Sequence, residues 1–253
     1  MHRAFHAAAA LLLNSLSPLT SAADESALAS NRFTAERVFD IEYAAAPRIS
    51  PDGESIVYVR HSMDRRADQN RGDLWIIDLD SGEHRPLVTG GASASSPTWS
   101  PDGKRLLYRS SADGKPELRV LFLDTGRSFS LAQFERAPQS PAWSPDGQHI
   151  AFTLFVPGEP PSCAKPPKAP EGAEWNKPVR VFDDPTFRLD GPGSLDDGVD
   201  QIFVLSAEGG SPRQLTHGPA DLSEPAWLDN ATLVVSGNLA EDRDLDPIES
   251  ELY

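Results

Sequence analysis

Short runs of alternating apolar and polar residues recur along the chain, and several follow the same turn. The three clearest are ISPDGESIVYVR from Ile49, WSPDGKRLLYRS from Trp99 and WSPDGQHIAFTL from Trp143. Alternation with a period of two predicts β-strands. Pro-Asp-Gly closes a hairpin because proline presets φ, aspartate bonds back to the backbone, and glycine takes the left-handed conformation. The pattern therefore predicts an all-β chain of repeated hairpins.

Two series of positions repeat in step. Prolines lead the first strand of each unit at Pro47, Pro97, Pro141 and Pro225, with spacings of 50, 44 and 84. Apolar anchors of a later strand stand at Leu74, Leu118, Ile202 and Leu252, with spacings of 44, 84 and 50. A period near 44 residues made of short strands is typical of a β-propeller, whose blades are four-stranded sheets.

The second unit can be divided into four strands: SPTWS, KRLLYRS, ELRVLFLD and SFSLAQF. Counting units from Pro47 predicts a partial propeller of about three and a half blades over residues 47–253, with the fourth blade stopping in its third strand at ELY. Because a propeller closes with about four to eight complete blades, we expect the sequence to be a fragment of a longer protein.

The 84-residue spacing predicts an insertion at about residues 156–199, which opens with a proline-rich loop from Val156 to Pro178. Insertions in repeat proteins usually emerge on one face, often the binding face. Trp175, Arg180 and Arg188 could contact a ligand there, although a packed or disordered loop explains them equally well.

The aspartates of the repeated turns, Asp52, Asp102 and Asp146, are predicted to be turn formers and not general acids. Each stands before a glycine inside a hairpin signal.

Three tryptophans, Trp99, Trp143 and Trp227, occupy one register of the first strand, where the first unit has Ile49. Large apolar residues at equivalent positions are expected to pack between neighbouring blades. The alternative is an aromatic platform facing the central tunnel.

The N-terminus has the form of a secretory signal peptide over residues 1–23, followed by a lead-in segment over 24–46. Arg3 precedes an apolar run from Ala7 to Leu13, and small residues near Ala22 suit cleavage. We therefore expect a periplasmic or secreted protein. Its single cysteine, Cys163, excludes an intramolecular disulfide and is interpreted as an incidental loop thiol.

Composition and charge exclude some partners. The 23 prolines and 18 glycines favour many short elements joined by turns. The formal charge is 23 − 38 = −15, or 22 − 38 = −16 without the leader. Such a field repels phosphate, so neither nucleic acid nor an anionic membrane surface is expected as a partner.

The chain resembles the N-terminal part of prolyl oligopeptidase family serine peptidases, closest to the acylaminoacyl-peptidase and dipeptidyl-aminopeptidase-like branches. The resemblance covers Phe33 to Tyr253. It includes FTAERVFDIEYAAAPRISPDG from Phe33, the repeated Ser-Pro-Asp-Gly units, and VRVFDDPTFRLDGPG leading to QIFVLSAEGGSPRQLT. TolB-like periplasmic propellers use similar repeats. The resemblance implies a propeller that caps an α/β-hydrolase domain and admits only short peptides to a serine, aspartate and histidine triad.

No catalytic residue is predicted in the chain itself, because the sequence has no Gly-x-Ser-x-Gly elbow. The nearest strings, from Gly90 and from Gly191, lack the second framing glycine. The remaining histidines outside the leader are expected at strand ends or turns, in solvent: His61, His84, His149 and His217.

No metal or cofactor site is predicted either. The acidic segment Asp242–Pro247 resembles a calcium loop, but it has Pro247 where glycine is needed and Tyr253 where glutamate is needed.

Three functions remain open. The leading hypothesis is a substrate-gating propeller of an exported serine peptidase, inactive alone, whose partners are a C-terminal α/β-hydrolase domain of the same parent chain and short peptide substrates. The second is a TolB-like periplasmic propeller that binds proteins. The third is a half propeller that completes itself by dimerisation.

Overall fold

The computed structural model describes residues 33–111, 114–162, 167–176, 179–183, 185–191, 193–243, 245 and 249–253. The expected signal peptide and Cys163 lie outside these residues. The chain divides into two compact units, Met1–Asp40 and Ile41–Tyr253, and the first contains a short 3-10 helix, η1 (Ala35–Asp40). Within the described part of the chain, no helix is long and apolar enough to cross a membrane.

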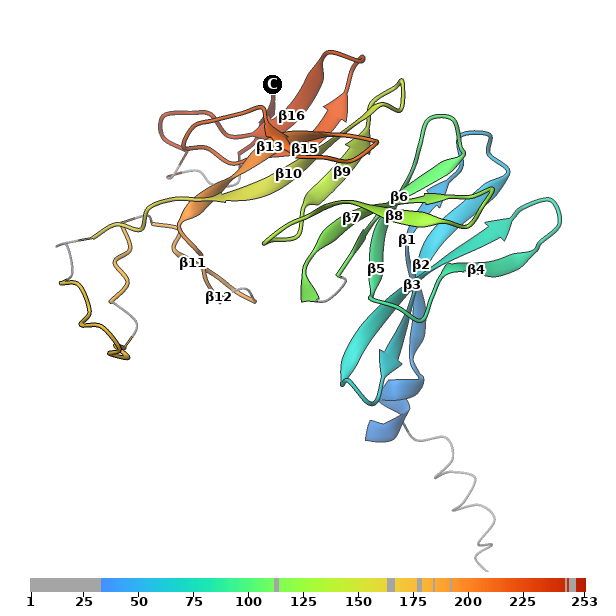
Figure 1. Ribbon diagram of the computed structural model, residues 1–253, viewed down its shortest axis with the longest axis horizontal. Coiled ribbons are helices and arrows are strands. Elements are labelled where there is room, and N and C mark those ends of the chain that lie inside the picture. Colours follow the sequence, from blue (N-terminus) through green and yellow to red (C-terminus); the bar gives the residue numbers. More distant parts are fainter. Residues whose placement is uncertain are drawn as a thin grey trace, which may run out of the picture. The chain divides into compact units, whose positions relative to one another are not determined.

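The first sheet has the order β1-β2-β3-β4 and is antiparallel throughout (Figure 1). Its strands are β1 (Glu42–Ile49), β2 (Ser55–Asp64), β3 (Gln69–Asp78) and β4 (His84–Val88). The expected start of the propeller at residue 47 is too late, because the end of the lead-in segment already pairs with β2 from Glu42 onward.

The second sheet follows the division into four strands that the sequence predicts. It contains β5 (Ala94–Trp99), β6 (Arg105–Ser110), β7 (Glu117–Phe122) and β8 (Ser128–Gln133), in the order β5-β6-β7-β8.

The third sheet contains the insertion between its second and third strands. The sheet is formed by β9 (Gln139–Trp143), β10 (His149–Pro157), β13 (Gly198–Ser206) and β14 (Arg213–Gln214). Since β10 runs to Pro157 and β13 starts at Gly198, the insertion covers residues 158–197, slightly less than expected. It includes a small hairpin of β11 (Arg188–Leu189) and β12 (Gly193–Ser194).

The fourth sheet has three strands, in the order β15-β16-β17, within the described residues. They are β15 (Leu222–Trp227), β16 (Leu233–Gly237) and β17 (Glu251–Leu252). Three four-stranded sheets and one of three strands confirm the predicted all-β partial propeller.

The Ser-Pro-Asp-Gly turns are held by the serine as much as by the aspartate. In the second sheet, Ser100 is 0% exposed; its Oγ donates to Asp102 Oδ1 (2.5 Å) and accepts from the N–H of Arg105 (2.9 Å). Ser50 and Ser144 make the same pair of bonds in their own turns.

Hydrogen bonds from these serines are the main cause that lowers the pKa of each turn aspartate below its ordinary value. The aspartates Asp52, Asp102 and Asp146 are therefore turn formers, as predicted, and the glycines that follow them have φ of 80°, 69° and 67°.

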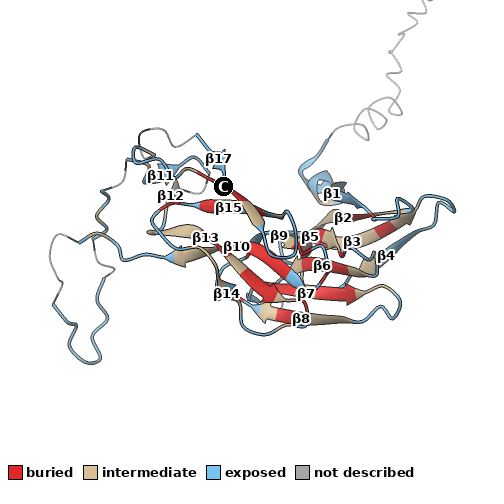
Figure 2. Ribbon diagram, turned by 90° about the horizontal axis from the view of Figure 1, so that it is seen from above, coloured by how far each residue is buried: buried red, intermediate tan, exposed pale blue. Residues whose placement is uncertain are grey.

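Apolar side chains fill the spaces between successive sheets. Between the first two sheets, Val57 and Leu74 pack against Leu106 and Tyr108. The next interface is larger and joins Leu118 to residues of the third sheet such as Phe152 and Trp143, and a smaller cluster joins Ile202 to the fourth sheet. Figure 2 shows the buried positions running along the central strands of the sheets.

The tryptophans pack between sheets, as predicted, and they also form a ladder of hydrogen bonds. Each indole N–H donates to a backbone carbonyl in the first strand of the preceding sheet. The three bonds join Trp99 to Arg48 (3.0 Å), Trp143 to Thr98 (3.2 Å) and Trp227 to Ala142 (3.1 Å). These contacts therefore do not support the alternative that the tryptophans form an aromatic platform facing a central tunnel.

A bulge recurs in the first strand of every sheet. The residue before each leading proline has a positive φ between 46° and 52°: Ala46, Ser96, Ser140 and Glu224. In each sheet this residue and the proline together face one residue of the second strand, namely Tyr58, Tyr108, Phe152 and Val235. The bulge bends the strand and explains why a proline can stand inside it.

Candidate functional site

The strand ends of the stacked sheets form two opposite faces, which differ in the loops that they carry. Each strand is antiparallel to its neighbours in the sheet. The loops that join the first strand to the second and the third strand to the fourth therefore lie on one face. The loops that join the second strand to the third, and the fourth strand to the first strand of the next sheet, lie on the other face. The first face has the short repeated turns, and we call it the short-turn face. The second carries the β2–β3 hairpin, the insertion at 158–197 and the segment between β16 and β17, and we call it the long-loop face.

A cleft opens on the long-loop face between the insertion and the fourth sheet, with a volume of about 960 Å³. The insertion supplies one wall, including Phe182 and Phe187, and the start of β15 and the end of β16 supply the other. This volume lies within the range of small-ligand sites, roughly 300–1,000 Å³, and is sufficient for a short peptide.

Carboxylates dominate the lining of the cleft. Seven line it within the described residues, against one guanidinium, that of Arg243: Glu159, Asp183, Asp196, Asp197, Asp221, Glu224 and Glu249. Asp196 and Asp197 are paired with arginines. The cleft therefore attracts cationic groups more strongly than anionic ones.

The insertion is tied to its own base by a cluster of arginines. Arg136, from the connection before β9, forms an ion pair with Asp196 and lies 4.1 Å from the ring centroid of Phe155. Arg180 pairs with Asp197 (3.6 Å) and donates to the carbonyl of Leu195 (2.5 Å). Arg180 thus holds the insertion together, which is a different role from the ligand contact that the sequence left open.

Asp200 lies in β13, directly after the cleft-lining residues Gly198 and Val199, and is an unusual carboxylate. Its N–H donates to Asp221 Oδ1 (2.7 Å). Burial is the main cause that raises the pKa of Asp200, the charge of Asp221 raises it further, and Arg136 opposes both. The sequence offered no signal for this pair, because the two residues meet only when the connection into β15 folds against β13.

The wall formed by the insertion is partly aromatic. The rings of Phe182 and Phe187 lie 5.0 Å apart and are 39% and 45% exposed. Arg188 is exposed in β11, and Trp175 is 54% exposed. Neither of these two is among the residues that line the cleft.

Two histidines form side-chain hydrogen bonds within the described residues, and neither of their partners is a serine. His84 shares a hydrogen bond with Tyr58 Oη (2.7 Å), and His61 shares one with Asn70 Oδ1 (3.1 Å). His61 lies inside β2, which corrects its expected place at a strand end, because β2 and β3 are longer than their counterparts in the second sheet.

Metal ligands do not gather in the part of the chain that the structure describes, since no group of three His, Cys, Asp or Glu side chains is placed to hold an ion. The calcium-like segment Asp242–Pro247 lies partly outside the described residues.

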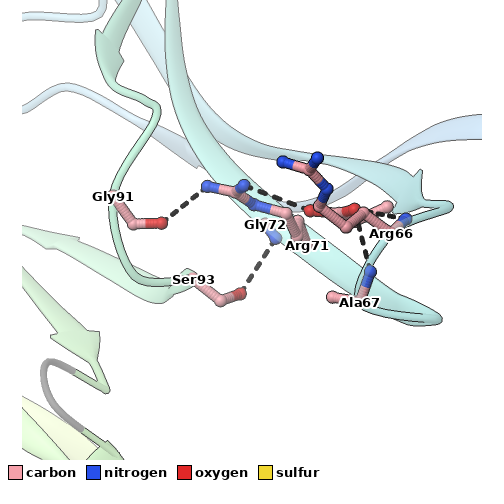
Figure 3. Close-up of polar contacts among 7 residues, drawn as sticks. Arg66, Ala67, Arg71, Gly72, Gly91 and Ser93 are labelled. Atoms are coloured by element: carbon pink, nitrogen blue, oxygen red, sulfur yellow. Dashed lines mark hydrogen bonds and ion pairs between the residues drawn. The ribbon is translucent and has the colours of Figure 1, made fainter.

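The connection between the first two sheets is closely packed on the long-loop face (Figure 3). Arg71 donates to the carbonyl of Gly91 (2.6 Å), and the N–H of Gly72 donates to Ser93 Oγ (2.9 Å). A Cβ on Gly72 would lie only 2.5 Å from the carbonyl oxygen of Ala94. A side chain at this position would push the first two sheets apart.

Comparison with known proteins supports the same architecture. The family model of the TolB β-propeller domain matches residues 56–161. The uncharacterized peptidase YuxL of Bacillus subtilis (strain 168) is 29% identical over 212 residues, which cover 83% of this chain and 32% of YuxL. The Tol-Pal system protein TolB 1 of Novosphingobium aromaticivorans is 35% identical over 88 residues, which cover 34% of this chain and 19% of that protein.

Among solved structures, the acylaminoacyl peptidase of Pyrococcus horikoshii superposes with a TM-score of 0.58 at 19% identity, covering 79% of this chain and 28% of that one. The chain thus spans about a third or less of the length of these relatives. It contains a TolB-like β-propeller segment that shares its fold with an acylaminoacyl peptidase and is distantly related to the peptidase YuxL.

Proposed function

We propose that this chain is the N-terminal, substrate-gating propeller of an exported serine peptidase that acts on short peptides. Its partner is an α/β-hydrolase domain of the same parent polypeptide, which supplies the catalytic serine, aspartate and histidine. The chain has no hydrolytic activity of its own.

The observation that carries the proposal is the extent of the similarity to YuxL. It runs through 83% of this chain but only 32% of that peptidase. A segment that matches about a third of a peptidase and folds as a propeller fits a domain that controls access, because the sequence contains no Gly-x-Ser-x-Gly elbow for chemistry.

The cleft on the long-loop face suits this role. Its volume of about 960 Å³ admits a short peptide and excludes a folded domain. The carboxylates that line it favour peptides with positive charge, and its aromatic wall offers apolar contact.

The test compares the 253-residue chain with the product of its reading frame followed beyond Tyr253. We expect the longer product to contain the serine elbow and to cleave short chromogenic peptides, and its elbow serine→alanine variant to be inactive. The 253-residue chain should cleave none of them. Turnover that copurifies with the short chain would contradict this division of roles.

Binding without chemistry is the second candidate, favoured by the 35% identity to a TolB protein over 88 residues. A reading frame that completes the propeller and stops without the serine elbow would establish it over the peptidase.

Export is part of the proposal and rests on the N-terminal pattern of residues 1–23. Fusing residues 1–30 to alkaline phosphatase, which is active only outside the cytoplasm, should give activity. An Arg3→Glu variant should weaken it, and a fusion lacking residues 1–23 should be inactive.

A further inference from the structure

The two walls of the cleft differ in chemistry. Among the described residues that line it, both aromatic side chains, Phe182 and Phe187, belong to the insertion. The fourth sheet and the residue before it contribute polar and acidic side chains, among them Asp221 and Glu224. A ligand that carries an apolar group beside a cation is therefore complementary to both walls.

The guanidinium of Arg180 orders the aromatic wall. Its Cζ lies 4.8 Å from the ring centroid of Phe182. The same group donates to the carbonyl of Leu195 (2.5 Å) and pairs with Asp197 (3.6 Å). Phe187 is joined to this segment because the N–H of Leu195 donates to its carbonyl (2.9 Å), and its ring lies 5.0 Å from that of Phe182. The position of Arg180 therefore decides where both rings stand.

Arg136 connects this wall to the sheets. It lies in the connection between β8 and β9, where it forms an ion pair with Asp196 and lies 4.1 Å from the ring centroid of Phe155 in β10. Asp196 in turn lies 4.0 Å from Arg180. The carboxylate of Asp196 is thus shared by one arginine of the insertion and one outside it.

The connection that carries Arg136 is itself firmly held. Phe134 is 7% exposed, and its N–H donates to the carbonyl of Pro116 (2.8 Å). On the other side, Arg109 donates to the carbonyl of the buried Pro138 (3.0 Å). Since both flanks are bonded to groups in or next to the second sheet, Arg136 offers a fixed point from which the insertion can be positioned.

We propose that Arg136 is a positioning residue of the cleft: through Asp196 and Arg180 it keeps the aromatic wall opposite the carboxylates of the fourth sheet. This arrangement makes the cleft selective for peptides in which an apolar side chain stands next to a basic one. The inference rests on the proposed function for the nature of the ligand, but the positioning role itself does not require a peptide.

The ion pairs are too exposed to stabilise the sheets strongly. The side chains of Arg136 and Asp196 are 48% and 57% exposed, and pairs of this kind contribute little to the free energy of unfolding. Removing them should therefore leave the sheets folded, with the same urea midpoint. A long loop depends on fewer contacts than a central strand does, so the aromatic wall should lose its fixed position.

The first test measures the position of the wall without any ligand. In a Cys163→Ser background, nitroxide labels at Asp190→Cys, in the exposed turn between β11 and β12, and at Ala231→Cys, exposed between β15 and β16, report the distance from the insertion to the fourth sheet. Double electron–electron resonance should give a distance distribution for Arg136→Gln about twice as wide or wider. Arg136→Lys, which keeps the charge, should be intermediate. Arg188→Gln, the same change at an exposed arginine of β11, is the matched control and should leave the distribution unchanged.

The second test measures selectivity by isothermal titration calorimetry with three peptides. Wild type should bind Ala-Phe-Lys-Ala about tenfold or more tightly than Ala-Phe-Glu-Ala, and about threefold or more tightly than Ala-Ser-Lys-Ala. Arg136→Gln should bind the phenylalanine and serine peptides equally but still prefer lysine to glutamate, because Asp221 and Glu224 keep their places. A general loss of structure would remove both preferences together. Arg136→Lys should retain part of the preference for phenylalanine, and Arg188→Gln should retain both preferences.

An unchanged distance distribution in Arg136→Gln would overturn the inference. So would a preference for phenylalanine that survives this substitution, or a preference for lysine that disappears with it. If wild type binds none of the peptides while Arg136→Gln still widens the distribution, the selectivity and the peptide-gating function are both rejected and the positioning role stands. The failure of the inference and that of the proposed function are therefore distinguishable.

Discussion

Replacing Trp143 by phenylalanine tests whether the indole ladder joins the sheets. Trp143 is 8% exposed, its N–H donates to Thr98, and Arg105 lies 4.7 Å from its ring centroid. Loss of the hydrogen bond costs about 0.5–1.5 kcal/mol. The space left by the smaller ring costs roughly 1–2 kcal/mol more, as part of the 3–5 kcal/mol for complete truncation. A weaker cation–π contact adds a few tenths of a kcal/mol.

The expected loss of unfolding free energy is therefore about 2–4 kcal/mol. Urea unfolding followed by circular dichroism should show it as a midpoint lower by about 1 M or more, with an unchanged slope. The matched control is Trp175→Phe, because this side chain is 54% exposed on the insertion and should change stability by no more than about 0.5 kcal/mol. Equal effects of the two substitutions would refute the ladder as a source of stability.

Three further substitutions test other parts of the fold. Gly72→Ala should lower the free energy of unfolding by about 1–3 kcal/mol through overpacking. A Cβ at Gly91 would have no atom within 4 Å, so Gly91→Ala should leave the free energy of unfolding nearly unchanged in the same urea titration. Ser100→Ala should cost about 1–3 kcal/mol at pH 7, and the deficit should shrink as pH falls through the lowered folded pKa of Asp102; a deficit that is constant with pH contradicts the bond. Asp200→Asn should raise the urea midpoint at pH 7, because the native state penalises this charge, and the gain should disappear as pH falls through the raised folded pKa towards 3.8. A lower midpoint at pH 7 would show that the charge of Asp200 is needed.

The repeated part of the fold is predictable from the sequence because local and tertiary signals agree there. Pro-Asp-Gly specifies a hairpin by backbone chemistry alone, and the spacing of Leu74, Leu118, Ile202 and Leu252 specifies which strands are equivalent. The tryptophan register predicts packing between sheets. It does not predict the indole hydrogen bonds, since their acceptors are backbone carbonyls of the preceding sheet and have no side-chain signature.

The bulges could not be predicted, because local rules oppose them. A residue before proline favours the extended region, and a left-handed backbone is unfavourable for alanine, serine and glutamate. Yet Ala46, Ser96, Ser140 and Glu224 all adopt it. Contacts between the sheets must therefore impose the conformation. The cleft was equally hidden, since it combines insertion residues such as Phe182 with Asp221 and Glu224, which stand far apart in the sequence.

The two faces differ in how regularly contacts between sheets repeat on them, and this difference explains where an insertion can be added. On the short-turn face, serine-capped turns also bridge neighbouring sheets: Arg105 donates to the carbonyl of Gly147 (3.0 Å), and the N–H of Asp146 donates to Asn230 (3.0 Å). Changing such a turn disturbs two sheets at once. Among the described residues, the long-loop face has no equivalent repeat, so the 40 residues of the insertion at 158–197 can be added there without breaking the ladder. A cleft built by an insertion therefore disturbs the propeller least on the face where the cleft is found.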